Sequence, residues 1–260
     1  MKQQLNALIA IAARDVTKFL RDKPRLIITF VFPFVFIGIL GGSLQANLGQ
    51  YLGYNFLVFS FIGVIGQTLF QSTASGIISL VADRESDFSQ EIFVSPISRY
   101  TIIFGKILGE STIAFVQTLG IILFGIITRI PFDLTRILSL LPFAFVICLF
   151  GGAFGVIVMS KLSGQRTANQ IFPFIIFPQF FLAGVFNPIT NLPPHLYILS
   201  RLAPMTYAVD MLRSVYYSGL PEAGKTTLYH PLINFLVIMV LFVIMLTIGT
   251  SLFVQNERNR

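Results

Sequence analysis

Long apolar stretches separated by short polar segments run along the chain. No residue between Leu26 and Ala82 is charged, and the polar residues 43–55 divide this stretch in two. The pattern predicts membrane-spanning helices near residues 26–44, 54–82, 101–128, 137–160, 168–186 and 231–254. At a rise of about 1.5 Å per residue, each is roughly 28 Å or longer, enough to cross the hydrocarbon core of a bilayer. We therefore expect an all-α polytopic membrane protein with six transmembrane helices and both termini on the same side.

Residues 1–23 predict a different kind of helix. Apolar residues recur there at helical spacing, at Leu5, Leu8, Ile9, Ala12, Val16, Phe19 and Leu20. Basic residues occupy the opposite face, so we expect an amphipathic interfacial helix that lies on the membrane surface in contact with lipids. A cleaved signal peptide is not expected, because Arg14, Asp15 and Lys18 interrupt any apolar core.

Composition and charge agree with a membrane protein. Of the 260 residues, 55% are hydrophobic and 11% are charged, and the net charge is +7. The basic residues lie at the ends of apolar stretches rather than in one patch, so nucleic acid is not expected as a partner. With the N-terminus inside, thirteen of the 18 Lys and Arg residues fall on the inner side. We therefore expect the plasma membrane, with both termini cytoplasmic and residues 187–230 outside.

A metal centre, a disulfide or a bound cofactor is not expected in this chain. Cys148 is the sole cysteine and lies in an apolar stretch, and the two histidines are far apart in sequence. Four residues match the phosphate-loop pattern: Gly219, Gly224, Lys225 and Thr226. We interpret this match as accidental, because a phosphate loop joins a strand to a helix, whereas here a helix precedes the pattern and an apolar span follows it.

Polar side chains also occur inside the predicted spans. Four of them recur four residues apart and so share one helix face: Gln67, Gln71, Ser75 and Ser79. This face can hydrogen-bond to neighbouring spans or line a substrate path. Glu110 lies well inside a span, one turn after Lys106, and either a local ion pair or a role in substrate or proton movement would explain it. The candidate substrate path comprises Gln67, Gln71, Ser75, Glu110 and Gln117.

Two pairs of glycines have the spacing that lets helix backbones approach closely. Gly105 precedes Gly109, and Gly151 precedes Gly155, by four residues each. Contact between two copies of the chain is one interpretation, and packing within one chain is the simpler one.

The densest charge lies between the second and third predicted spans, in a stretch that we call the acidic segment (residues 83–98). Four carboxylates fall close together there: Asp83, Glu85, Asp87 and Glu91. Pro96 disfavours helical backbone at Ser95, so the chain should turn there and return to the membrane. A solvated loop and a docking surface for a basic partner both fit this pattern.

A second polar stretch, residues 187–219, precedes the last span and is punctuated by proline. Pro188, Pro193 and Pro194 break the chain, whereas Pro204 suits the first turn of a helix. One apolar face follows: Met205, Ala208, Val209, Leu212 and Tyr216. We expect short re-entrant helices at the outer membrane face, with their non-helical backbone buried by protein.

Two motifs resemble signatures of ABC-type-2 transporter permeases, the membrane subunits of a class of ATP-driven exporters. The stretch DRESDFSQEIFVSPISRYTIIFGKIL resembles the family's acidic stretch followed by Ser-Pro, a basic residue and Gly-Lys. The stretch FFLAGVFNPITNLPPHLYILSRLAPMTYAVDMLR resembles its second signature, which lies between the last two spans. Both motifs occur at the family's places among six spans, and the resemblance covers nearly the whole chain.

The resemblance implies one transmembrane permease domain over residues 1–260, which is not an enzyme. Two copies would pair with two ABC ATPase subunits, and those subunits would bind ATP and Mg. The acidic segment would be a coupling helix that docks on the ATPase through Asp83, Arg84, Glu85, Asp87, Phe88, Glu91, Ile92, Ser95 and Pro96. An outer gate would include Asn187, Pro188, Pro193, Pro194, Pro204 and Tyr207.

The sequence indicates the general class of the transported substrate but does not identify the molecule. The fifth predicted span is rich in phenylalanine and the spans carry little charge, which favours export of a hydrophobic or amphipathic substrate such as a drug or lipid. A polysaccharide or lipid-linked glycan is an alternative, since sugars also stack on aromatic rings. An ion-coupled secondary transporter is a further alternative, but it would need more buried ionisable groups. A membrane scaffold that transports nothing would leave the polar face and the outer helices unexplained.

Overall fold

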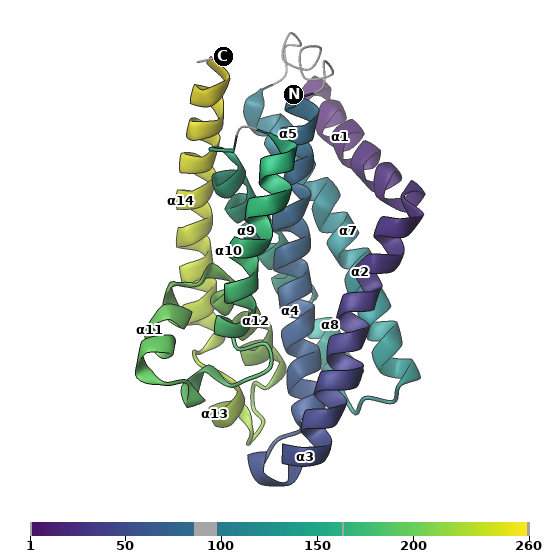
Figure 1. The fold of residues 1–260 in the computed structure, drawn as a ribbon, viewed down its shortest axis with the longest axis vertical. Coiled ribbons are helices and arrows are strands. Elements are labelled where there is room, and N and C mark those ends of the chain that lie inside the picture. The colour runs from purple at the N-terminus through teal and green to yellow at the C-terminus, as the bar shows by residue number, and fades with distance from the viewer. Residues whose placement is uncertain (1, 86–97, 163, 259–260) are drawn as a thin grey trace.

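The computed structural model describes residues 2–85, 98–162 and 164–258, which form a bundle of long helices (Figure 1). The elements follow the order α1 (Lys2–Arg21), α2 (Lys23–Val35), the π-helix η1 (Phe36–Gly41), α3 (Gly42–Leu52), α4 (Phe56–Gly76), α5 (Ile78–Glu85), α7 (Arg99–Ile127), α8 (Leu134–Ser139), α9 (Leu141–Met159), α10 (Gln165–Leu182), the 3-10 helix η2 (Ile189–Asn191), α11 (Pro194–Leu202), α12 (Pro204–Tyr216), α13 (Ala223–Thr226) and α14 (Pro231–Arg258). No strand occurs among the described residues. The predicted all-α fold class is confirmed.

Most of the predicted spans are present as long apolar helices. Within the described part of the chain, five stretches are long and apolar enough to cross a membrane: Leu26–Asn47, Phe56–Asp83, Tyr100–Ile127, Leu141–Met159 and Ala223–Gln255. Helix α10 holds the position of the remaining predicted span, but it begins with the polar sequence QRTANQ and is not among these five. The protein is a multi-pass helical membrane protein, and the count of six spans stays a prediction.

The two ends of the bundle carry different elements (Figure 1). Helix α1 begins and α14 ends at one end, where α5 also ends and α7 begins. Helices α3 and α13 lie at the opposite end. This arrangement is the one that an even number of spans requires, and the orientation in the membrane stays a prediction.

Side-chain caps fix where several helices begin. Asn55 accepts a hydrogen bond from the Val58 amide (3.0 Å) at the start of α4. Ser98, the last residue of the acidic segment, accepts one from the Thr101 amide (3.1 Å) at the start of α7. Each cap satisfies a backbone N–H that the first helical turn leaves without a partner. The Ser98 cap therefore sets the point at which the chain re-enters the bundle.

Both glycine pairs mark close packing between helices of one chain. A Cβ atom at Gly109 would lie 3.1 Å from the Ala12 Cα, so α7 touches the backbone of α1 there, and Gly105 lies against the same helix. A Cβ atom at Gly155 would lie 2.5 Å from the Ala74 carbonyl oxygen, which places α9 directly against α4. Small residues permit these approaches because any side chain would collide with backbone. Packing within the chain, the simpler interpretation, is confirmed.

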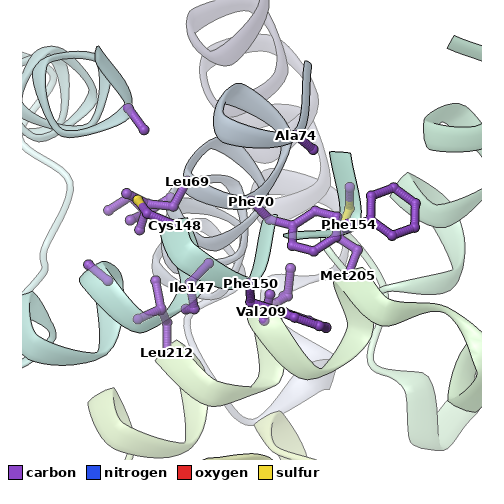
Figure 2. Close-up of a cluster of buried hydrophobic side chains, with 14 of the residues drawn as sticks. Leu69, Phe70, Ala74, Ile147, Cys148, Phe150, Phe154, Met205, Val209 and Leu212 are labelled. Atoms are coloured by element: carbon purple, nitrogen blue, oxygen red, sulfur yellow. The ribbon is translucent and has the colours of Figure 1, made fainter. Parts of the chain in front are cut away.

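The centre of the bundle is an apolar core to which α4, α9 and α12 contribute together with α7, α10 and α14. Figure 2 shows Leu69 and Phe70 of α4, Ile147 and Phe150 of α9, and Met205 of α12 gathered in one cluster with further buried side chains. The Phe70 and Phe150 ring centroids lie 5.4 Å apart. Helix α12 thus packs across α4 and α9 instead of extending into solvent.

Candidate functional site

Charged side chains from three helices meet at the end of the bundle where the acidic segment begins. We call them the ionic cluster: Arg14, Asp15 and Lys18 of α1, Asp83 of α5, and Lys106 of α7. Lys106 Nζ lies 2.7 Å from Asp83 Oδ2 and 3.0 Å from Asp15 Oδ2. Arg14 also pairs with Asp83, and Lys18 Nζ lies 3.6 Å from Asp83 Oδ1. One set of charges therefore joins α1 to both α5 and α7.

The charges at the centre of the ionic cluster are buried, and burying them costs free energy. Only 2% of the Lys106 side chain and 4% of the Asp15 side chain are exposed. Removing both charges from water is costly, and their pairing and the additional hydrogen bond from Lys106 Nζ to Ser79 Oγ (3.1 Å) offset this cost. Loss of one partner from such a pair typically costs about 3–5 kcal/mol, because the remaining charge stays buried. The ionic cluster therefore holds α1, α5 and α7 together.

The residues predicted to dock on an ATPase fall into three groups. Asp83 is held in the ionic cluster with 13% of its side chain exposed, so its carboxylate is already paired within the chain. Arg84 and Glu85 are the last residues of α5, and their side chains lie outside the described part of the chain. Six more lie wholly outside the described residues: Asp87, Phe88, Glu91, Ile92, Ser95 and Pro96. Docking through these side chains stays a prediction.

The apolar face predicted for α1 is divided between two surroundings. Phe19 is fully buried against the bundle. Leu5, Ile9 and Leu20 are each more than half exposed on the outside of the helix. An outward apolar stripe of this kind suits contact with lipid. The amphipathic helix itself is therefore present, and its place on the membrane surface stays a prediction.

The outer stretch, residues 187–219, forms short helices as predicted. Pro194 opens α11 and Pro204 opens α12. The apolar face predicted for α12 is buried: Met205, Ala208, Val209, Leu212 and Tyr216. The remaining gate candidates differ in exposure, since Pro188 is buried, Asn187 and Pro193 are exposed, and Tyr207 donates a hydrogen bond to the Arg201 carbonyl (2.8 Å). A gating role stays a prediction.

Arg213 of α12 anchors this outer stretch to the rest of the bundle. The buried guanidinium donates to three backbone carbonyls, those of Gly184 (2.6 Å), Val185 (2.8 Å) and Phe59 (3.2 Å). Burial lowers the pKa of Arg213 to about 10, so the side chain stays protonated at neutral pH. One side chain thereby holds together α12, the chain after α10 and the first turn of α4.

Asp210, one turn before Arg213, makes a second anchor. It accepts hydrogen bonds from the amides of Leu228 (2.7 Å) and Tyr229 (2.9 Å) and from Asn234 Nδ2 (2.7 Å). Burial raises the pKa of Asp210, and these hydrogen bonds oppose that rise. Asp210 therefore fixes the connection between α13 and α14 against α12. We call Asp210 and Arg213 together the outer clamp.

Most of the candidate substrate path lines one hollow. A cavity of about 180 Å³ is bordered by Gln67, Gln71, Ser75 and Gln117, with α2 completing the wall. An adjoining hollow of about 210 Å³ shares Phe32, Gln71 and Ser75 and continues along α10. Glu110 is not part of either lining and packs against Gly76. The structure thus brings four of the five candidates together, and their role in transport stays a prediction.

The phosphate-loop match does not have the geometry of a phosphate loop. Gly219 follows α12 with φ of 73°, and Gly224, Lys225 and Thr226 fall in the four-residue helix α13. Helix and turn, rather than a strand, precede the glycines. The pattern therefore lacks the strand-to-helix context on which phosphate binding depends.

The ionic cluster and the outer clamp are not apparent from the sequence. Helical periodicity places Arg14 and Lys18 on the polar face of a surface helix, and it offers Lys106 only its neighbour Glu110 as a partner. The available signal is the charge of Lys106 inside an apolar span, which demands a partner from elsewhere. The partner Asp15 is 91 residues away in sequence, so the pairing depends on the packing of α1.

Comparison with known proteins identifies the family. Residues 6–217 match the model of the ABC-2 type transporter family, and this range includes most of the bundle, the ionic cluster and the outer clamp. The chain therefore belongs to the ABC-2 type transporters, and the resemblance noted in the sequence is confirmed. Its long apolar helices agree with membership of a transmembrane permease family.

Curated relatives carry permease names. The chain is 27% identical over 62% of its length to "Putative transport permease ycf38" of Cyanophora paradoxa, covering 57% of that protein. It is 28% identical over 62% of its length to "Probable multidrug ABC transporter permease YbhR" of Escherichia coli, covering 43%. For these two, the chain spans about half of the relative's length. It is 25% identical over 89% of its length to "Inner membrane transport permease YadH" of Escherichia coli, covering 90%.

Proposed function

We propose that this chain is the membrane-spanning subunit of an ABC exporter, in which two copies pair and dock two separate ATPase subunits. The ATPases bind ATP and Mg and hydrolyse the nucleotide, and this chain is not catalytic. Its place is the plasma membrane, with both termini and the acidic segment in the cytoplasm. Membership of the ABC-2 type transporters supports the partnership with an ABC ATPase.

The observation that carries this proposal is the position of the ionic cluster at the base of the acidic segment. Asp83 opens that segment and pairs with Lys106 of α7 and Arg14 of α1. A displacement of the acidic segment therefore acts on three helices together and not on a loose loop. Coupled transport requires such a connection, because the two arrangements of the permease must respond to nucleotide bound elsewhere.

Docking itself is assigned to the part of the acidic segment beyond Asp83. Glu85, Asp87 and Glu91 would supply polar contacts, and Phe88 and Ile92 would supply apolar anchors in a groove of the ATPase. Asp83 is not assigned to docking, because its carboxylate pairs with Arg14 and Lys106 within the chain. The re-entrant helices α11 and α12, held by the outer clamp, would form the exit gate at the opposite end.

The cargo that we propose is hydrophobic or amphipathic, of the drug or lipid type. The hollows beside α4 combine amide and hydroxyl groups with phenylalanine rings, a lining that suits such molecules. The naming of one relative as a probable multidrug ABC transporter permease supports the same class.

The test is assembly and coupling with the ATPase. The chain is expected to co-purify with a separately encoded ABC ATPase, and the triple variant Glu85→Lys, Asp87→Lys, Glu91→Lys should abolish assembly or uncouple ATP hydrolysis from transport. The matched control is Glu222→Lys, which makes the same kind of charge reversal at the opposite end of the bundle and should leave assembly unchanged. Transport by the purified chain in vesicles with an ion gradient and no ATPase would instead establish a secondary transporter.

A further inference from the structure

The two hollows beside α4 adjoin each other, and we call them together the amide-lined cavity, which has a polar floor and an aromatic wall. Helix α4 lies between α2 and α10 (Figure 1), and both hollows include Phe32, Gln71 and Ser75. The polar floor consists of Gln67, Thr68, Gln71, Ser72, Ser75 and Gln117. The aromatic wall consists of Phe32, Phe172, Phe177 and Phe180. The cavity therefore offers an apolar body and a hydrogen-bonding group to one molecule at once.

The floor has hydrogen-bonding capacity that the protein does not use. Gln67 Nε2 donates to Gln71 Oε1, which pairs the two amides. Gln67 is 3% exposed, yet its Oε1 atom finds no hydrogen-bond partner among the described residues. A buried acceptor without a partner is unfavourable, so a ligand that brings an N–H or O–H donor gains from supplying the missing bond.

No charge is available in this cavity to balance a charged ligand. Neither hollow, as far as the described residues go, is lined by an Asp, Glu, Lys, Arg or His side chain. Burying an ion beside amides and phenyl rings without a counter-charge is strongly unfavourable. An uncharged group is not penalised in this way.

We infer that the amide-lined cavity selects an uncharged amphipathic molecule, with an N–H or O–H group bound at Gln67 and Gln71 and a ring-bearing apolar body against the phenylalanine wall. This inference rests on the proposed function and narrows its cargo class. Phe32 and Phe177 are 41% and 61% exposed, so the ligand enters sideways between α2 and α10 from the lipid phase. Gln67 and Gln71 are then specificity-determining residues.

The absence of tryptophan from the sequence permits a direct binding test on the purified full chain in nanodiscs. The variant Phe177→Trp places a single tryptophan on the cavity wall, and we call it the wall reporter. The variant Phe145→Trp places one on the exposed face of α9, away from the cavity, and we call it the outside reporter. The probes are the uncharged phenylnaphthylamine, which carries one N–H donor, and its sulfonated analogue anilinonaphthalene sulfonate. Energy transfer from tryptophan to each probe is titrated.

The uncharged probe is expected to saturate the signal of the wall reporter at a concentration about tenfold lower than the sulfonated probe. With the outside reporter, both probes should show only unsaturable partition into lipid. In the Phe177→Trp background, Gln67→Leu and Gln71→Leu should each weaken binding of the uncharged probe by about two- to tenfold, the value of one lost hydrogen bond. Gln50→Leu, an exposed position in α3, should not change it.

Equal binding of the two probes, or titrations that are the same for the wall and outside reporters, would overturn the inference. So would glutamine variants that bind like the parent, or a cavity closed to both probes by a second copy of the chain. Gln71 is only partly buried, so its variant tests the site even where Gln67→Leu fails to fold. Probe binding is measured without ATP or the ATPase. A loss of probe binding can therefore be distinguished from a loss of ATPase docking.

Discussion

At the scale of single residues, Arg213 shows how one buried charge organises a segment. Its guanidinium donates to three carbonyls and its Cζ lies 3.5 Å from the centroid of the Phe59 ring. A lysine ammonium carries its donors on one nitrogen and lacks the planar fork that reaches three acceptors. We expect Arg213→Lys to lower the free energy of unfolding by about 1–3 kcal/mol, because buried carbonyls lose partners.

Thermal unfolding of the purified chain in detergent measures this effect. The control is Arg201→Lys, because Arg201 is exposed and its guanidinium lies over the rings of Tyr197 and Tyr229. Its midpoint should stay close to that of the parent chain. Equal shifts in the two variants would show that Arg213 is not a special anchor.

Individual side chains are the part of the site that sequence predicts least. Gln67, Gln71 and Ser75 can be grouped correctly because helical periodicity alone places them on one face. Lys106 can be recognised as needing a partner, yet Asp15 cannot be chosen, since that choice depends on how α1 lies across α7. The sequence predicts that Asp83 faces a partner protein, whereas its pairing draws it into the ionic cluster.

At the scale of helices, the contact between α1 and α7 depends on Gly109. A Cβ atom there would lie 3.1 Å from Ala12 Cα and 3.2 Å from the Ala12 carbonyl oxygen, and backbone atoms cannot rotate away. We expect Gly109→Leu to separate α1 from α7 and to destabilise the chain by about 1–3 kcal/mol, as overpacking does. Limited proteolysis should then cleave α1 faster than in the parent chain.

The control for this variant is Gly42→Leu, since a Cβ atom at Gly42 meets nothing within 4 Å. Its α1 should be cleaved at the parent rate. Unchanged proteolysis in Gly109→Leu would mean that the helices have room to slide, so that glycine is not required at their contact.

Helices are predicted well where the apolar pattern is long, and less well where polar residues interrupt it. The span predicted near residues 101–128 corresponds to α7 (Arg99–Ile127), because apolar residues predominate along its whole length despite Lys106 and Glu110. The span predicted near residues 54–82 is divided into α4 and α5 at Ile77, which hydropathy does not mark. Helix α10 combines a polar start with Pro173 and Pro178, so its role as a span is the hardest to judge.

At the scale of the whole molecule, α4 and α5 connect every candidate site. Phe59 in the first turn of α4 accepts from Arg213 of the outer clamp. Gln67 and Gln71 at its middle form the floor of the amide-lined cavity. Asp83 of α5 then joins the ionic cluster. A movement of the acidic segment therefore reaches the cavity and the outer helices along one continuous length of chain.

The whole-molecule arrangement also predicts which sites face the same side of the membrane. The start of α1 and helix α13 lie at opposite ends of the bundle (Figure 1), and Ser218 lies in the short connection between α12 and α13. Cys148 is fully buried in α9, so Cys148→Ala should give a folded background without cysteine. In that background, Ser218→Cys should react with a membrane-impermeant maleimide in intact cells, since Ser218 is exposed and the charge distribution places it outside.

Gln3→Cys is the matched variant at the other end, because Gln3 is an exposed residue of α1. It should react only after the membrane is permeabilised. The opposite pattern, with Gln3→Cys labelled in intact cells and Ser218→Cys protected, would invert the topology. It would also move the acidic segment away from any cytoplasmic ATPase, and the docking proposal would fall with it. Labelling of both variants in intact cells would place the two ends on one side, which an even number of spans with an outer re-entrant stretch does not allow.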